Sequence, residues 1–226
     1  MNGATLSFQD IVRSRRSVRH FRSDPVPRAI IDEVLHDAQH SPSNCNTQPW
    51  SVHIVSGSAR DALSEALHKA RDANNLSPDF SWDETAYYGR YGERRREHGH
   101  IYYENLGVAR TDMEARREAH KANYSFFNAP HVALLFVPVI GDNVRVAGDL
   151  GMYGQTFLLS LAARGLGGVP QTVIGFYADT VRSTLGIGEE FRLLFGISFG
   201  YPDEGAIANT HRIGRDPVPG CVTFHT

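Results

Sequence analysis

The sequence of 226 residues has little of what marks several large classes of protein. It contains only two cysteines, Cys45 and Cys221, which predicts two free thiols in a reducing compartment rather than a disulfide framework or a cysteine zinc site. The formal net charge is only −2, which argues against a partner such as nucleic acid or an anionic membrane surface. No apolar run approaches the roughly 20 residues of a membrane span, and residues 1–10 lack the pattern of a signal peptide. We therefore expect a cytoplasmic protein with no membrane or nucleic-acid partner.

Familiar catalytic signatures are also missing. There is no Walker phosphate loop and no Gly-x-Ser-x-Gly elbow, and residues 165–168 do not complete a dinucleotide-binding fingerprint. His36 and His40 have helical i, i+4 spacing, but no acidic third ligand follows in a recognised pattern. Solvated or capping histidines are therefore expected there, and no metal site is predicted.

Helical and strand patterns alternate along the chain without repeats. Helical spacing of apolar residues predicts helices at 30–38, 58–75, 111–127, 149–164 and 179–185, preceded by a short helix capped by Ser7. Strands are predicted at 51–55, 129–137 and 192–200, with a loop or short strand at 170–175. The run 129–137 is apolar throughout, which is typical of a central strand buried on both faces. The helix at 149–164 is almost wholly apolar or small, so we expect it to be buried nearly all round, in the core or at a subunit interface. The fold class is α+β or α/β, with helices on both faces of a small sheet.

Two segments depart from these patterns. Residues 76–110 mix tyrosines and other aromatics with many arginines and histidines, over a length too great for a plain connector. This composition predicts a lid, or an excursion over a pocket or a partner. Residues 207–226 have few periodic signals and are expected to form an extending arm. The whole chain, 1–226, is interpreted as one domain.

The segment from Ser41 to Trp50 is stiff and rich in side-chain amides. Its two prolines restrict the backbone, and three of its side chains offer a donor and an acceptor each: Asn44, Asn46 and Gln48. Such a loop suits the edge of a planar, neutral heterocycle, and a flavin ring has an edge of this kind. The alternative is an ordinary polar loop with a turn at each proline.

Arginines cluster near both ends of the chain. The first cluster contains Arg13, Arg15, Arg16, Arg19 and Arg22, with Ser14, Ser17 and His20 between them. Guanidinium groups bind phosphate bidentately and serine adds a neutral donor, so this is a candidate phosphate clamp. Arg212 and Arg215 form the second cluster, which would converge on the same phosphate if the fold brought the two ends together. Solvated basic faces are the alternative for both clusters.

Five motifs in a fixed order give the chain a resemblance to a known family. They are Arg15-Arg-Ser-Val-Arg19, Ser41-Pro-Ser-Asn-Cys-Asn-Thr-Gln-Pro-Trp50, Gly168-Val-Pro-Gln-Thr172, Phe199-Gly-Tyr-Pro-Asp203 and the run from Asn209 to Arg215. Together they resemble the nitroreductase family of FMN-dependent enzymes over essentially the whole length. Residues 87–95 and 123–130 resemble the branch that includes nitrobenzoate reductases.

The resemblance implies a nitroreductase-like α+β fold with a small, mostly antiparallel central sheet, in an intertwined homodimer that holds two FMN sites at the subunit interface. It implies the following cofactor-binding residues: Arg15, Arg16, Ser17 and Arg19 for the phosphate, ribityl chain and O2 side of the flavin; Pro42, Ser43, Asn44, Asn46 and Gln48 from the loop, contributed by the other subunit; Pro170, Gln171 and Thr172 near N5; and Arg212 and Arg215 at the phosphate. Some relatives have a lysine two residues before the last arginine, where this chain has Ile213. Arg212 is the candidate substitute.

The resemblance also implies an activity. NAD(P)H would reduce the flavin, and a nitroaromatic or similar planar acceptor would reoxidise it in a ping-pong cycle, so that no catalytic side chain is required. The acceptor pocket is predicted to involve Tyr88, Tyr91, Arg95, Tyr124 and Phe127, with the arginines of the excursion favouring a carboxylated aromatic. The alternatives are another flavin reaction on the same fold (reductive dehalogenation, enone or quinone reduction, or oxidation by the flavin) or a flavin-binding module without turnover.

Overall fold

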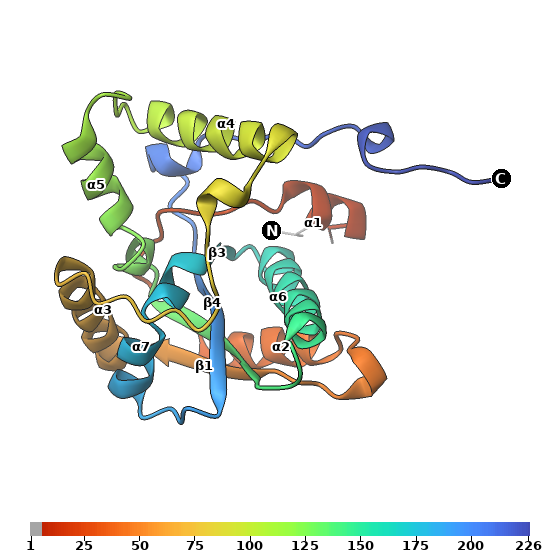
Figure 1. The fold of residues 1–226 in the computed structure, drawn as a ribbon, viewed down its shortest axis with the longest axis horizontal. Coiled ribbons are helices and arrows are strands. Elements are labelled where there is room, and N and C mark those ends of the chain that lie inside the picture. The colour runs from red at the N-terminus through yellow and green to blue at the C-terminus, as the bar shows by residue number, and fades with distance from the viewer. Residues whose placement is uncertain (1–5) are drawn as a thin grey trace, which may run out of the picture.

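A four-stranded sheet forms the centre of the computed structural model, which describes residues 6–226 (Figure 1). The expectation about a signal peptide falls partly on residues 1–5, outside the described part of the chain. The strands are β1 (Ser51–Ser56), β2 (His131–Pro138), β3 (Gly167–Gln171) and β4 (Phe191–Gly200), in the spatial order β1-β2-β4-β3. Every pairing in this sheet is antiparallel. The predicted small antiparallel sheet is thus confirmed, and 170–175 proves to be the end of a strand followed by a short 3₁₀ helix.

Strand β2 lies inside the sheet and is buried on both faces. It pairs with β1 on one side and β4 on the other, and residues 131–137 are all buried. Alternate side chains therefore enter different cores: Phe136 and Leu134 belong to one, and Leu135 and Ala133 to the other. An apolar run without alternation is what such a strand requires, and the prediction from the sequence is confirmed.

Helices cover both faces of the sheet (Figure 1). α2 (Arg28–Gln39) and α6 (Val144–Ala163) pack on one face, and α3 (Gly57–Asp72) and α7 (Ala178–Leu185) on the other. Phe157 and Leu150 of α6 fill the first core together with Val34 of α2. Leu63 and Leu67 of α3 fill the second core with Val181 of α7. The layered arrangement matches the periodicity of the apolar residues, which places one stripe of each helix against the sheet.

The ends of two helices show how local chemistry sets their bounds. α1 (Phe8–Ser14) begins with a capping box, in which the Ser7 hydroxyl accepts from the Asp10 amide and the Asp10 carboxylate accepts from the Ser7 amide, both at 3.2 Å. α6 ends at Ala163, and Gly165 two residues later has a φ of +70°, the left-handed conformation that closes a helix. The helix begins five residues before the predicted start, at Val144, whose amide donates to the Asp142 carboxylate at 3.0 Å.

Helix α6 is not buried all round within the protomer. One side carries fully buried residues such as Phe157, while Val144, Gly148, Gly151 and Met152 are exposed on another. The prediction of burial on nearly every side is therefore wrong for the isolated chain. An exposed stripe of small and apolar residues agrees with the other half of that prediction, a subunit interface.

The segment between α3 and β2 contains two helices that stand away from the sheet. α4 (Gly89–Asn105) runs across the top of the molecule in Figure 1, and only Gly92 among its residues is buried. α5 (Met113–Lys121) descends from it. The helix predicted at 111–127 is shorter in the structure, where α5 ends at Lys121. Further along, Phe126 and Phe127 have φ of +55° and +54° and lie outside the right-handed helical region.

The start of this excursion is fixed to the second layer by a buried ion pair. The Asp79 carboxylate accepts from Arg182 of α7 at 2.6 and 3.0 Å, and from the Leu193 amide of β4 at 2.7 Å. Both side chains are about nine-tenths buried. Ser77 adds backbone hydrogen bonds to Phe176 and Ala178. The excursion thus has a rigid base and a solvent-exposed far end.

The C-terminal residues run away from the body of the protein (Figure 1). Residues 214–226 are all exposed, and Phe224 exposes 84 % of its surface. None of the helices in residues 6–226 is both long enough and apolar enough to cross a membrane.

Candidate functional site

The two arginine clusters meet in one cleft of about 810 Å³. Arg15, Arg16 and Arg19 come from the segment after α1, and Arg212 and Arg215 from the start of the arm. Arg212 donates to the backbone oxygen of Ser14 at 3.1 Å, which ties the arm to the C-terminal end of α1. The convergence that the sequence offered as one alternative is therefore present in the protomer, with Ser17 also lining the cleft.

The cleft concentrates positive charge that carboxylates of the described residues neutralise only in part. Burial, and then the charge of Arg215, lower the pKa of Arg15, although a guanidinium remains protonated at any physiological pH. Arg16 pairs with Glu204 at 2.7 Å through one nitrogen, while its buried Nε has no partner among the described residues. A buried donor of this kind without an acceptor is rare, and an oxyanion in the cleft would supply one.

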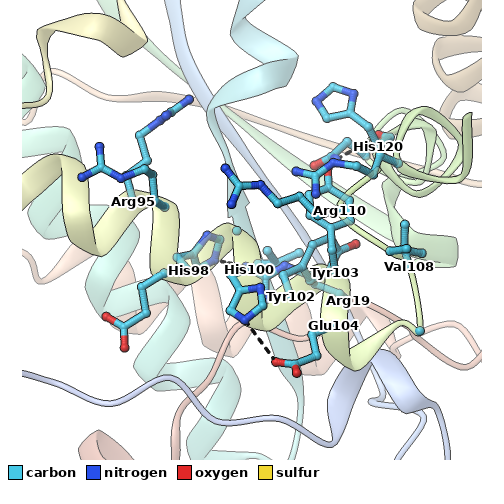
Figure 2. Close-up of a pocket in the computed structure, with 18 of the residues that line it drawn as sticks. Arg19, Arg95, His98, His100, Tyr102, Tyr103, Glu104, Val108, Arg110 and His120 are labelled. Atoms are coloured by element: carbon cyan, nitrogen blue, oxygen red, sulfur yellow. Dashed lines mark hydrogen bonds and ion pairs between the residues drawn. The ribbon is translucent and has the colours of Figure 1, made fainter. Parts of the chain in front are cut away.

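The cleft opens into a second, larger cavity through two shared residues. Arg19 and His98 line both spaces, and Arg19 Nη2 lies 3.3 Å from His98 Nε2 (Figure 2). Because a guanidinium only donates, Nε2 must be the unprotonated acceptor. Burial, followed by the charges of Arg19 and His211, lowers the pKa of His98 and so favours the neutral ring. Arg19 also lies 5.2 Å from the centre of the Tyr102 ring and accordingly stays fixed at the junction.

The larger cavity, of about 1210 Å³, lies between the excursion and the end of β3. Phe127, Val169 and Pro170 give it apolar surface, and Tyr102 and Tyr103 project from α4. Its lining includes these charged residues: Arg19, Arg95, Arg96, Arg110, Arg116, Glu84, Glu97 and Glu104. It accordingly combines flat aromatic surface with a net positive charge.

The arginines of this cavity fall into two groups. Arg95 forms an ion pair with Glu84. Arg110 and Arg116 make no ion pair within residues 6–226, and the Arg116 guanidinium lies 3.9 Å from the centre of the Tyr103 ring. Arg110, His120 and Tyr103 all line the cavity and are labelled in Figure 2. A guanidinium that stacks on a ring keeps its donors available for an anion.

The predicted acceptor-pocket residues are divided by the structure. Arg95 and Phe127 line the larger cavity. Tyr88 and Tyr91 lie at the start of α4 with their ring centres 5.8 Å apart, exposed and outside the lining of either cavity in the protomer. Tyr124 is buried in the core against Tyr177, and this burial, with the Tyr177 hydrogen bond, raises its pKa. Tyr124 therefore lies in the core and is not part of the lining of the cavity.

The end of β3 presents its backbone and Pro170 to the larger cavity, while Gln171 turns inward. The Gln171 amide nitrogen donates to the Asn123 backbone oxygen at 2.9 Å, and its oxygen accepts from the buried Ser198 hydroxyl. Thr172 is exposed. Gly168 allows α6 to pack tightly behind this strand, because a Cβ there would lie 2.8 Å from a Leu158 methyl carbon. The Val18 amide donates to Gly168 at 3.2 Å and so fixes the arginine segment beside β3.

The loop from Ser41 to Trp50 has an unusual backbone. Cys45, Asn46 and Gln48 all have positive φ, at 52°, 55° and 47°. Each left-handed residue other than glycine costs on the order of 1 kcal/mol, and such residues gather at functional sites. The side chains from Pro42 to Gln48 are exposed or half-buried. The Gln48 backbone amide donates to the Ser43 hydroxyl at 2.9 Å, and the Gln48 side-chain oxygen accepts from Gln39 of α2 at 2.9 Å. None of the residues 42–48 lines either cavity of its own protomer.

The sequence interpretation missed several residues that build these spaces. They are His98, His211, Tyr102, Tyr103, Arg110, Arg116 and Asn209. Asn209 is the most informative of them, because its side chain accepts from the Arg19 amide at 2.8 Å and donates to the His20 and Asp203 carbonyls. The unusual composition of 76–110 signalled Tyr102, Tyr103 and Arg110, whereas Arg116 lies beyond it in the predicted helix at 111–127. Nothing in the pattern singled out Asn209 within its motif. No group of three or more metal-ligating side chains was found in residues 6–226.

Comparison with known proteins gives a consistent result. The model of the family described as "Nitroreductase family" matches residues 12–201. The chain is 44 % identical to nitroreductase NfnB of Mycolicibacterium smegmatis over 205 residues, which cover 91 % of this chain and 87 % of that protein. It is 33 % identical to a 4-nitrobenzoate reductase of Pseudomonas putida over 223 residues, which cover 97 % of this chain and 96 % of the relative.

Solved structures agree. The FMN-dependent nitroreductase NfnB from Mycobacterium smegmatis, crystallised in complex with NADPH, superposes with a TM-score of 0.93 at 42 % sequence identity. The superposition covers 96 % of this chain and 97 % of that one.

Proposed function

The chain belongs to the nitroreductase family, and from that premise we propose that it is an FMN-dependent oxidoreductase that reduces nitroaromatic acceptors with NAD(P)H. The observation that carries the proposal is the convergence of the two arginine clusters in a cleft that opens, through Arg19 and His98, into an aromatic cavity. The relatives named above supply the identity of the cofactor and the reductant.

The residues of the cleft fit an FMN phosphate. The buried Nε of Arg16 lacks an acceptor within the described residues, and Arg15 and Arg215 are close enough for the charge of one to depress the pKa of the other. A phosphate dianion would accept a hydrogen bond from Arg16 Nε and would reduce the repulsion between Arg15 and Arg215. Arg15, Arg16, Ser17, Arg212 and Arg215 are thus the residues that would hold the phosphate.

Arg19 and the end of β3 would hold the ring. Arg19 lies where the cleft meets the aromatic cavity, so the phosphate end of the cofactor would occupy the cleft and the reactive end would face the cavity. Bound FMN would supply the hydride chemistry, taking hydride from NAD(P)H and passing it to the acceptor in a ping-pong cycle. The protein would orient the ring through the Arg19 guanidinium and the backbone and Pro170 of β3, because Gln171 uses its side chain inside the core.

Two copies of the chain would complete each site. The loop from Pro42 to Gln48 presents its amides to solvent and reaches neither cavity of its own protomer. Exposed apolar side chains mark the surface that a second copy would cover: Phe8 and Val12 of α1, Val144 and Met152 of α6, and Val218, Val222 and Phe224 of the arm. The outer edge of β1 pairs with no strand among the described residues and would receive the partner's arm. We expect an intertwined homodimer on these grounds.

The positive charge of the aromatic cavity favours a carboxylated nitroaromatic. Arg110 and Arg116 have no carboxylate partner within residues 6–226, and the tyrosines beside them offer flat surfaces for an aromatic ring. The excursion at 76–110 would act as the lid that selects the acceptor.

Spectroscopy and kinetics on the purified protein test the proposal. We expect a yellow protein with about one FMN per chain, bleached by NADPH or NADH without oxygen and restored by 4-nitrobenzoate. A colourless protein that takes up no FMN would contradict the proposal. Flavin that binds but resists both nicotinamides would favour a binding module. Parallel rates with halophenols and enones separate nitroreduction from the other flavin reactions, and light scattering at several concentrations tests the dimer.

A further inference from the structure

Asp149 of α6 is a buried carboxylate with an incomplete set of hydrogen bonds. Only 4 % of the residue is exposed, although carboxylates are rarely buried without several donors or a counter-charge. Its Oδ1 accepts from the backbone amide of Asn44 at 3.1 Å. Its Oδ2 has no partner among the described residues, and no arginine or lysine forms an ion pair with it there. Packing alone does not account for a carboxylate here, since an apolar residue would fill the space without the desolvation cost.

The position of Asn44 gives that single hydrogen bond its importance. Asn44 is the first residue of the 3₁₀ turn Asn44–Asn46 and directly precedes Cys45, where the backbone becomes left-handed. The turn closes through Asn46 N to Ser43 O at 3.0 Å and Thr47 N to Asn44 O at 3.1 Å. Asn44, Asn46 and Gln48 are exposed, so their amides face outward while Asp149 holds the backbone from behind.

The remaining hydrogen bonds found between the loop and α6 in the described residues lie at the start of the loop. The Ser41 hydroxyl donates to the Met152 carbonyl at 3.4 Å and contacts the Thr156 hydroxyl at 2.8 Å. Beyond Ser41, the hydrogen bond from Asn44 to Asp149 is the only one found between the loop and α6 in residues 6–226. Removing it would leave no hydrogen bond from the left-handed turn itself to α6. The flanking residues would still be held, because Gln48 and Trp50 bond to Gln39 of α2 and the Trp50 ring packs against Tyr153.

We infer that Asp149 is a positioning residue for the flavin site: through the Asn44 amide, it holds the amide-bearing turn in the strained conformation that presents it to the FMN of the partner subunit. This inference rests on the proposed function, because the ligand of the turn is taken to be FMN. Asp149 is not among the residues that line either cavity of its own protomer. Its effect on the cofactor would therefore be transmitted through the turn.

Substitutions at Asp149 separate the hydrogen bond from the charge. Asp149→Asn keeps an oxygen that accepts from Asn44 and places its NH₂ where Oδ2 has no partner, so we expect FMN affinity within about threefold of wild type. Asp149→Ala removes the acceptor, so we expect FMN to be held at least tenfold more weakly. Asp37→Ala is the matched control, because Asp37 joins α2 to α6 through Ser160 and Arg164 without contacting the turn. We expect this control to lower the melting temperature while FMN affinity stays unchanged.

A second pair of variants tests the same bond from the donor side. Asn44→Pro deletes the N–H, and the extended Ser43 before it (φ −143°, ψ 158°) is compatible with a following proline. Asn44→Ala removes the side chain but keeps the N–H. When residue 149 is aspartate, we expect the proline variant to bind FMN at least fivefold more weakly than the alanine variant. When Asp149 is replaced by alanine, we expect this difference in FMN affinity between the two variants to be no more than twofold.

The readouts are FMN retained by the purified holo-protein after dialysis, the FMN dissociation constant by fluorescence titration, and the visible circular dichroism of the bound flavin. Wild-type FMN affinity in Asp149→Ala would overturn the inference. So would equal losses in Asp149→Asn and Asp149→Ala at unchanged melting temperatures, because the charge rather than the hydrogen bond would then be responsible. Failure of the wild type itself to bind FMN would instead contradict the proposed function.

Discussion

The sheet layers and the excursion at 76–110 are built on opposite principles. In the layers, β2 is buried from end to end and α6 packs Phe157 and Leu150 into the core. In α4, 17 residues bury only Gly92 and expose arginines, tyrosines and glutamates. In the proposed function, the layers would hold the parts that the flavin needs, namely the arginine segment, the end of β3 and the turn at Asn44. The excursion supplies most of the charged lining of the aromatic cavity. Its surface would therefore set the choice of acceptor, while the layers would set the chemistry.

A core substitution should separate the two regions most strongly. Phe157→Ala removes a fully buried ring that packs edge-to-face against Phe199, and we expect a loss of about 3–5 kcal/mol in the free energy of unfolding. Tyr88→Ala, at a side chain that is 77 % exposed, should change it by less than about 0.5 kcal/mol. Urea unfolding at one fixed protein concentration measures both. Similar losses would show that the excursion carries stability that the protomer does not reveal.

The base of the excursion should behave like the core, although it belongs to the excursion. Asp79→Ala leaves Arg182 buried without its carboxylate, and we expect a loss of about 3 kcal/mol with faster proteolysis at 76–110. Glu84→Gln breaks the more exposed pair with Arg95 and should cost at most about 1 kcal/mol. If both variants resist trypsin as the wild type does, the anchor is not what holds the excursion in place.

Charge substitutions in the aromatic cavity should alter selectivity and leave stability unchanged. Arg116→Gln removes a cation with no ion pair in the described chain, so the ratio of kcat/KM for 4-nitrobenzoate to that for nitrobenzene should fall about tenfold, or about 1.4 kcal/mol. Arg95→Gln should lower that ratio less, because Glu84 already neutralises Arg95. A change in the NADPH-to-NADH ratio at constant acceptor selectivity would assign Arg116 to the dinucleotide instead.

Acid should distinguish the regions through their histidines. His131 is buried, its Nε2 accepts from the Val26 amide at 2.9 Å, and burial lowers its pKa. The unfolded chain then binds the proton more readily than the folded one. The stabilising effect is full above the unfolded pKa of about 6.5 and is lost as the pH falls below it.

The melting temperature should therefore drop between pH 7 and pH 5, by about 2–4 °C for each kcal/mol lost. His131→Gln should have a lower melting temperature than wild type at pH 7, and its melting temperature should change less between pH 7 and pH 5. His100→Gln, at an exposed position of α4, should keep the wild-type slope. An unchanged slope in His131→Gln would assign the acid sensitivity to another group.

Periodicity revealed the layers because their residues are sorted by burial. The apolar run at 129–137 indicates a strand that is buried on both faces, and the helical spacing at 30–38 indicates which side of the helix faces the core. Both elements are confirmed. α4 was not predicted as a helix because it has no apolar stripe: its exposed surface is occupied by arginines, tyrosines and glutamates in no helical order. Its ends are likewise unmarked, since Tyr88 makes no side-chain cap.

The site was predictable where a motif carried chemistry and unpredictable where the backbone carried it. Arg15, Arg16 and Arg215 could be proposed from their guanidinium groups, and the structure brings them into one cleft. The inward turn of Gln171 could not, because it depends on Ser198 and Asn123 from distant segments. The role inferred for Asp149 could not be predicted either. It depends on a hydrogen bond from the Asn44 amide, which is distant in sequence and is known only from the structure.

Arg19 and His98 line both spaces and contact each other, and this contact has a thermodynamic consequence. A molecule that enters the aromatic cavity and displaces His98 would also change the position of the Arg19 guanidinium, which lines the arginine cleft. Coupling of this kind is reciprocal, so that an acceptor that loosens FMN by some factor must itself be bound more weakly by that same factor when FMN is present. Release of the cofactor by certain acceptors, and its protection by others, would then be the two signs of one coupling free energy between the two spaces.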